Sequence, residues 1–180
     1  MNAAPAQTLD TPLWAFSLAV YGADGVGPEC LDLQERFGVD VNLLLFAAYA
    51  GAREGVQLDT SDIAAAAAAV SAWHGEIVRA LRGARHGLKP LSLDASNPLQ
   101  AATAVLRTKV KAAELEAEKI EQAMLWLWSQ RHLAGRTRSD AAVALVANLH
   151  ALLAHFGAPA EFAAPTKLQT AALAFIGAKS

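Results

Sequence analysis

The sequence predicts an all-α, single-domain bundle of six or seven helices with one long central helix. Three observations favour this fold class. Alanine, which loses least on entering a helix, supplies much of the 54% apolar content. Prolines preceded by capping residues mark several helix starts. Apolar residues also recur at spacings of three and four, as on one face of a helix, and no segment shows the alternation typical of a strand.

The front of the chain predicts three helices, over Thr11–Tyr21, Gly27–Phe37 and Asp40–Arg53. A proline lies in the first turn of the first two, where its missing N–H breaks no helical hydrogen bond. Asp40 is a suitable N-cap for the third helix. Because Leu43–Tyr49 is apolar all round, we expect this helix to lie deep in the bundle.

Residues 60–86 predict a fourth helix and residues 87–96, rich in Gly, Pro, Ser and Asp, a loop. The long fifth helix follows over 98–132. If these two helices pair antiparallel across the loop, Arg79 lies near Arg107, and residues 114–121 lie opposite 62–72. The expected inner face of the fourth helix is Ile63, Ala67, Val70, Trp73, Ile77, Leu81, Ala84 and Leu88. That of the fifth is Leu106, Val110, Ala113, Ala117, Ile120, Met124 and Leu127.

Two further helices are expected over 139–156 and 165–176, each with an apolar face at helical spacing. No apolar stretch reaches the length of about 20 residues that spans a bilayer, so we expect no membrane span. Cys30 is the only cysteine, which excludes an intrachain disulfide and favours the cytoplasm.

Charge is distributed unevenly along the chain. Residues 1–62 hold nine acidic and two basic side chains, whereas residues 63–138 hold eleven basic and six acidic ones. This asymmetry favours either packing of the acidic segment near the basic one or a basic surface for an anionic partner.

No motif for catalysis, metal or cofactor binding is present, so we expect no catalytic residue, no metal and no cofactor. Glu114, Glu118 and Glu121 share one side of the fifth helix, but no glutamate has the histidine three residues later that di-iron bundles use. We interpret these three carboxylates as a solvated helix flank. The five histidines also lack metal-ligand spacing.

A cluster of five basic residues is the strongest candidate binding site. Two interpretations stay open: neutralisation by Glu29, Asp32 and Glu35, or a site for an anion or an acidic protein partner. Nucleic acid is not expected, because the isoelectric point is about 6.2 and no aromatic residues interleave with the cluster. The five residues are Arg79, Arg82, Arg85, Lys89 and Arg107.

Four stretches resemble a family of small proteobacterial proteins that carries only a domain-of-unknown-function label. They are Leu13–Leu18 (LWAFSL), Cys30–Gln34 (CLDLQ), Gly38–Phe46 (GVDVNLLLF) and Glu114–Glu121 (ELEAEKIE). With Trp73 and Leu81–Lys89, the resemblance covers about Thr11–Trp128. It implies a bacterial, cytoplasmic setting and transfers no activity, cofactor or catalytic residue. We therefore expect a disordered tail over 1–10, the family's helical core over 11–135, and a C-terminal helical extension over 136–180 that packs on the same domain.

The absence of catalytic groups favours a non-enzymatic protein–protein adaptor or regulatory module and leaves a homo-oligomer open. The alternative is a bundle that binds or transforms an apolar, lipid-like ligand in an internal pocket. An exposed apolar stripe would favour the adaptor, and a closed apolar pocket would favour the ligand. The aromatic side chains expected to line such a pocket are Trp14, Tyr21, Phe46, Tyr49, Trp126 and Trp128.

Overall fold

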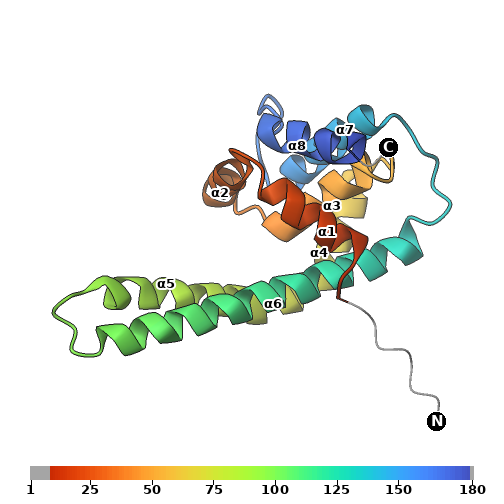
Figure 1. The fold of residues 1–180 in the computed structure, drawn as a ribbon. Helices are drawn as coiled ribbons and strands as arrows, with labels where there is room; N and C mark the ends of the chain where they lie inside the picture. Colours follow the sequence, from red (N-terminus) through yellow and green to blue (C-terminus); the bar gives the residue numbers. More distant parts are fainter. Residues whose placement is uncertain (1–8, 179–180) are drawn as a thin grey trace, which may run out of the picture. The chain divides into compact units, whose positions relative to one another are not determined.

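The computed structural model describes residues 9–178 and confirms the all-α prediction (Figure 1). This part of the chain contains no strand and one isolated bridge, between Val56 and Arg138. The segments α4, η1 and α5 follow one another without a break, so residues 9–178 form seven helices. The expected tail over 1–10 lies outside the described residues except for Leu9 and Asp10. The bounds are α1 (Pro12–Tyr21), α2 (Val26–Phe37), α3 (Val41–Ala52), α4 (Thr60–Trp73), η1 (His74–Val78), α5 (Arg79–Leu93), α6 (Gln100–His132), α7 (Ala141–His155) and α8 (Thr166–Gly177).

Side-chain caps fix the start of several helices, as the sequence predicts. The Thr11 hydroxyl accepts a hydrogen bond from the Trp14 N–H at 3.1 Å, and Asp40 accepts one from the Asn42 N–H at 2.9 Å. The start of α8 is capped from a distant segment, because the Glu29 carboxylate of α2 accepts the N–H groups of Lys167 and Leu168. A carboxylate at this end of a helix also interacts favourably with the helix dipole.

The loop expected over 87–96 is wrong, because α5 continues to Leu93. Pro90 lies inside its last turn, and the Pro90 carbonyl still accepts the Asp94 N–H at 3.1 Å. The connection is therefore a short turn. In it the Asp94 carboxylate accepts the Ser96 N–H and hydroxyl, and the Asn97 side chain accepts the Leu99 N–H. Such local bonds are what Asp and Asn supply in turns.

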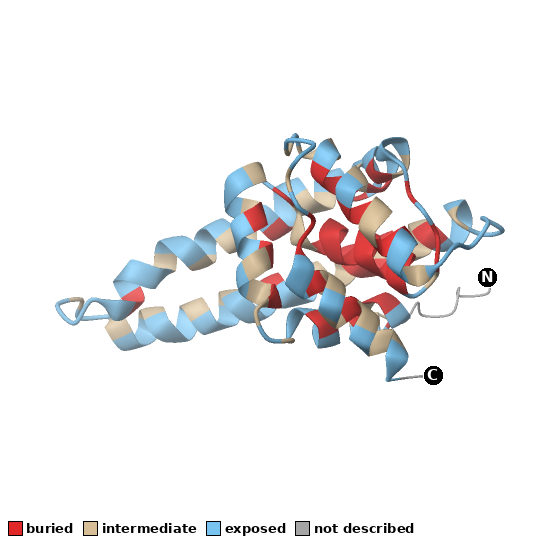
Figure 2. Ribbon diagram, turned by 90° about the horizontal axis from the view of Figure 1, so that it is seen from above, coloured by how far each residue is buried: buried red, intermediate tan, exposed pale blue. Residues whose placement is uncertain are grey.

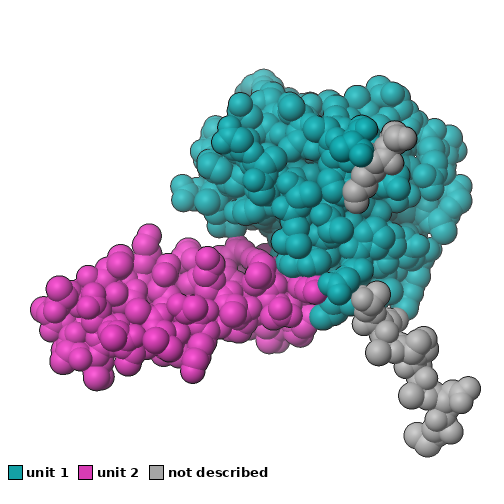
Figure 3. Space-filling view, viewed as in Figure 1, with its two compact units in different colours: residues 1–69, 122–180 teal, residues 70–121 magenta. Residues whose placement is uncertain are grey.

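The chain divides into two compact units (Figure 3). Unit 1 consists of residues 1–69 and 122–180, and unit 2 of residues 70–121. Both α4 and α6 contribute residues to each unit, so the chain is one domain with two compact parts. Among the residues that the structure describes, no helix combines the length and the apolar character needed to cross a bilayer.

Unit 1 is built around α3, which confirms the prediction that this helix lies deep in the bundle. Every residue from Asn42 to Ala52 is buried, and Figure 2 shows this helix almost entirely in the buried colour. It packs mainly against α7 and also contacts α1, α2 and α8. At Gly51 the two backbones meet, since a Cβ placed there would lie 2.5 Å from the Cα of Leu145. Only glycine permits this approach.

One buried polar side chain joins α7 to the segment after α3. The Asn148 amide nitrogen donates to the carbonyls of Ala47 and Val56 at 3.1 and 2.9 Å, and its oxygen accepts the Leu58 N–H at 2.7 Å. Asn148 is fully buried, so these bonds satisfy groups that would otherwise lose their hydration. The resulting unit has a tightly specified apolar core.

We predict that Gly51→Ala lowers the free energy of unfolding by about 1–3 kcal/mol, because the added methyl group must push α3 and α7 apart. Chemical denaturation followed by circular dichroism measures the loss. Gly83→Ala is the matched control, since a Cβ at Gly83 meets open space within α5. That change is expected to stabilise by about 0.5–1 kcal/mol. Equal effects of the two substitutions would contradict the close contact.

Candidate functional site

Unit 2 is a helical hairpin whose two arms are joined by several polar contacts. Figure 1 shows α5 and α6 side by side. Near the base of the hairpin, the Trp73 indole N–H donates to the Ala117 carbonyl at 2.9 Å. Further along, Arg82 lies opposite Glu114 and Glu118. Buried and half-buried residues of α6 recur at alternating spacings of four and three, and three of them contact the other arm, namely Glu114, Ala117 and Glu121. We call these residues the seam: Thr103, Arg107, Val110, Glu114, Ala117 and Glu121.

This pairing overturns the register expected from the sequence. The prediction set residues 114–121 opposite 62–72 and away from the arginines, whereas Arg82 and Arg85 contact Glu114 directly. The reason is the length of α5. Because this helix continues to Leu93, the turn lies later in the sequence than expected, and each residue of α5 pairs with a residue further along α6 than predicted. The interpretation of the glutamates as a solvated flank is also wrong, since Glu114 and Glu121 are 5% and 0% exposed.

The arginines are neutralised within the hairpin. Arg82 donates from Nε to Glu114 at 3.1 Å and from Nη2 to Glu118 at 2.7 Å. Arg85 donates to both oxygens of Glu114. Two-point contacts between a guanidinium and carboxylates hold both groups in a fixed geometry. The sequence contained a signal for this arrangement, namely two arginines and two glutamates at helical spacing, but only the correct register brings them together.

Glu114 and Glu118 share Arg82 yet titrate in opposite directions. Burial disfavours the charged form of Glu114, but the hydrogen bonds and charges of Arg85 and Arg82 outweigh it and lower the pKa of this carboxyl. Burial raises the pKa of Glu118, and its bond to Arg82 offsets this only in part. Glu114 is therefore the carboxylate whose ionised form the two arginines favour more strongly.

The His74 imidazole forms a second polar contact across the hairpin. Its Nδ1 lies 3.0 Å from an oxygen of the buried Glu121. His74 begins the π-helical turn η1, in which the Arg79 N–H donates to the His74 carbonyl. Such wide turns shift the phase of a helix and recur at functional positions.

The remaining acids and bases of the predicted cluster are placed differently. Neutralisation of the arginines by acids of residues 29–35 is one of the two interpretations that the sequence leaves open, and the structure places two of these acids elsewhere: Glu29 caps α8 and Asp32 pairs with Arg36. The acids that take this role are Glu114 and Glu118. Arg79 and Lys89 are exposed. Arg107 lies half-buried in the seam, where its Nε has no hydrogen-bond partner within the described residues.

Four of the predicted aromatic residues pack against one another in unit 1. The Tyr49 ring meets Trp126 edge-on at a centroid distance of 5.8 Å, and the Phe46 ring meets Trp128 at 6.0 Å. Phe46 is fully buried and Tyr49 nearly so, whereas both tryptophans are half-buried. Trp14 is half-buried in α1, and Tyr21 at the end of the same helix is exposed.

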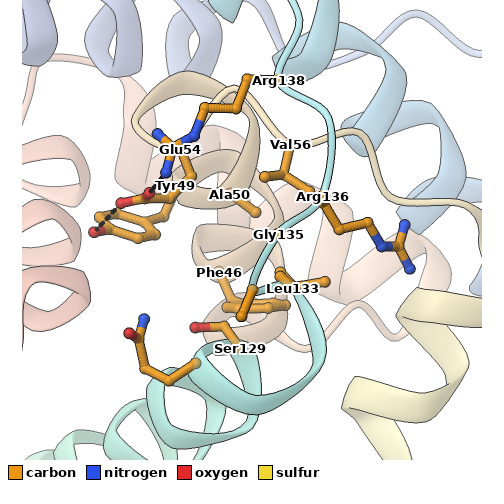
Figure 4. Close-up of a pocket in the computed structure, with 12 residues that line it drawn as sticks. Phe46, Tyr49, Ala50, Glu54, Val56, Ser129, Leu133, Gly135, Arg136 and Arg138 are labelled. Carbon is orange, nitrogen blue, oxygen red and sulfur yellow. Dashed lines mark hydrogen bonds and ion pairs between the residues drawn. The ribbon is translucent and has the colours of Figure 1, made fainter.

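A pocket of about 280 Å³ lies beside this aromatic group (Figure 4). Of the six predicted aromatics, only Phe46 and Tyr49 line it. The Tyr49 hydroxyl donates to Glu54 at 2.9 Å, and Arg138 pairs with the same carboxylate at 3.3 Å. Figure 4 shows this polar group above the apolar floor of the pocket. The pocket therefore mixes charged and apolar walls and suits a small polar molecule better than a lipid chain.

Unit 2 has an exposed apolar surface at positions where the sequence predicts a buried face. Leu106 is 50% exposed and Ile77 is 38% exposed, and Ala113 is also exposed, so this part of both predicted inner faces is wrong. Of the predicted α6 face, Ala117 is buried. The hairpin thus leaves large apolar side chains in solvent: Ile77, Leu91, Leu93, Leu99, Val105, Leu106 and Leu115.

The comparisons with known proteins give one match. A family model described as "Protein of unknown function (DUF2390)" matches residues 12–125. No curated protein and no solved structure matches the chain. The matched segment contains the four stretches on which the resemblance rests, and the predicted membership in a family of unknown function is confirmed.

We predict that Glu114→Gln lowers the free energy of unfolding by about 2 kcal/mol at pH 7, because it removes the charge that Arg82 and Arg85 share. The pKa of Glu114 is lowered in the fold, so its contribution is complete above the ordinary value of 4.5 and is lost as the pH falls through the lowered value. The difference between variant and parent, measured by urea denaturation across pH, should shrink below pH 4.5. Glu76→Gln, at an exposed glutamate of the same unit, is the control. A pH-independent difference would contradict this role for Glu114.

Proposed function

We propose that this chain, which belongs to the family described as protein of unknown function (DUF2390), is a cytoplasmic, non-enzymatic protein–protein adaptor. Its binding surface is the apolar face of unit 2. The observation that carries the proposal is the set of exposed leucines on this hairpin, among them Leu91, Leu99 and Leu106 at 52%, 67% and 50% exposure. Contiguous exposed apolar side chains on two neighbouring helices are typical of protein interaction sites.

The polar groups of unit 2 support binding rather than catalysis. Arg82, Arg85, Glu114 and Glu118 satisfy one another, so they serve as a structural clamp. Arg79 and Lys89 remain exposed and favour a partner surface that carries acidic side chains. The buried free thiol of Cys30 agrees with a cytoplasmic protein.

The alternative, a role in binding or transforming an apolar, lipid-like ligand, has less support. The pocket beside Tyr49 includes Glu54, Arg136 and Arg138 in its wall. Although Glu54 pairs with Arg138 and Arg136 with Asp62, a lipid chain would displace water from these charges and offer no polar group in return, which is costly. The exposed stripe and the charged pocket together favour the adaptor.

We predict that a photo-crosslinking benzoylphenylalanine placed at Leu106 in living cells yields a discrete protein adduct, because a partner covers this surface. Electrophoresis and mass spectrometry of the adduct report its presence and its identity. Val143 is the control position, since it is 56% exposed on α7 in unit 1. Absence of an adduct at Leu106, or equal adducts at both positions, would contradict an adaptor surface on unit 2.

A further inference from the structure

The exposed apolar row of α6 contains two charges of opposite sign. This row lies one residue before the seam and repeats at spacings of three and four, in the order Leu99, Ala102, Leu106, Lys109, Ala113, Glu116 and Ile120. All of these residues are exposed except the half-buried Ile120. In the described part of the chain, neither Lys109 nor Glu116 forms an ion pair. Each charge therefore lies within an otherwise apolar row.

A matching row begins in η1, continues along α5 and belongs to the same face of the hairpin. It runs through Ile77, Leu81, Ala84, Leu88 and Leu91, again at spacings of four and three. This row also lies one residue before a less exposed row through Val78, Arg85 and Ser92, in which Arg85 contacts Glu114 of α6. On two antiparallel right-handed helices, two rows that each lie one residue before the row facing the other helix fall on the same side of the pair. The two rows therefore form one two-helix apolar face.

We propose that this face binds the same face of a second copy of the chain, so that two hairpins form an antiparallel four-helix bundle. The inference rests on the proposed function, because it names the occupant of the adaptor surface. A two-helix layer with one apolar face is half of a four-helix bundle, and a two-fold axis can complete the bundle with an identical half.

The positions of Lys109 and Glu116 favour a second copy as the occupant of this face and favour an antiparallel orientation of its α6. They lie seven residues apart in the same row, and the small side chain of Ala113 lies between them. If a two-fold axis passes beside Ala113, Lys109 of each copy faces Glu116 of the other, and both charges are paired. A parallel arrangement would instead set lysine against lysine and glutamate against glutamate, which is unfavourable.

The size of the face sets the expected strength of the dimer. The two rows offer about a dozen side chains per copy, fewer than the roughly 20–30 of a standard interface. We therefore expect a dimer that dissociates on dilution, with Lys109 and Glu116 deciding orientation more than affinity.

The charge pair gives a test by reversal and by mixing. We expect sedimentation equilibrium of the full chain to show a monomer–dimer equilibrium. Lys109→Glu or Glu116→Lys alone should raise the dissociation constant of the dimer about tenfold or more, because each variant creates two like-charge contacts. An equimolar mixture of the two variants should form a heterodimer at parental strength, because both contacts then join opposite charges. Lys111→Glu is the matched control, since it makes the same charge change two residues away on another flank of α6 and should leave the equilibrium unchanged.

Leu106→Glu supplies a second route that does not depend on the charge pair, and it should give a monomer with unchanged circular dichroism. A parent chain that stays monomeric up to millimolar concentration overturns the dimer, as does a mixture that associates no better than its components. The adaptor proposal is judged separately by the Leu106 adduct. An adduct with a different protein, together with a monomeric parent, would overturn the second copy and leave the adaptor surface in place.

Discussion

The Glu114 carboxylate accepts hydrogen bonds from Arg82 and Arg85, and this contact determines how unit 2 presents the rest of its side chains. Two helices that pair through charged groups need not turn their apolar rows toward each other. The rows of α5 and α6 instead lie beside the seam, where most of their residues are exposed and Leu81, Leu88 and Ile120 are half-buried. Removing one partner of such a pair leaves an uncompensated charge, so the contact specifies register as well as stability.

Unit 1 follows the opposite principle. Its central helix α3 buries every residue from Asn42 to Ala52, and at Gly51 its backbone lies directly against that of α7. Asn148, a buried polar residue of α7, has its donors and acceptor satisfied. Unit 1 is thus organised by apolar packing, and unit 2 by ion pairs. An interaction surface is expected on the unit whose apolar side chains have no partner within it.

The sequence was sufficient for the helices and insufficient for their pairing. Thr11 and Asp40 predict helix starts correctly, because a short polar side chain just before a first turn can accept hydrogen bonds from its N–H groups. The centre of α3 predicts burial, because a helix that is apolar all round has no polar face to turn toward water. The sequence misplaces the turn of the hairpin because Pro90, which lacks an N–H for helical bonding, is typical of a helix end, whereas α5 continues through it to Leu93.

The candidate site was predictable only in part for the same reason. Arg82 and Arg85 stood out as a basic cluster, but their acidic partners depend on a register that spacing alone does not fix. The sequence also predicts that the apolar row through Leu106 and Ala113 is buried, which is wrong. Periodicity identifies an apolar face of a helix but does not show what covers it. That Leu106 row, exposed on the hairpin, is the surface for which we propose a second copy.

Disulfide formation at a single introduced cysteine tests this account most directly. Burial, with the charge of Glu29, raises the pKa of the native Cys30 thiol to about 12, so this cysteine stays inert. Ala113→Cys places a thiol beside the proposed two-fold axis, whereas Ala104→Cys places one on the outer flank of the same helix. Under mild oxidation we expect rapid interchain disulfide formation at position 113 and little at position 104. Equal, slow oxidation at both positions would contradict the paired apolar faces.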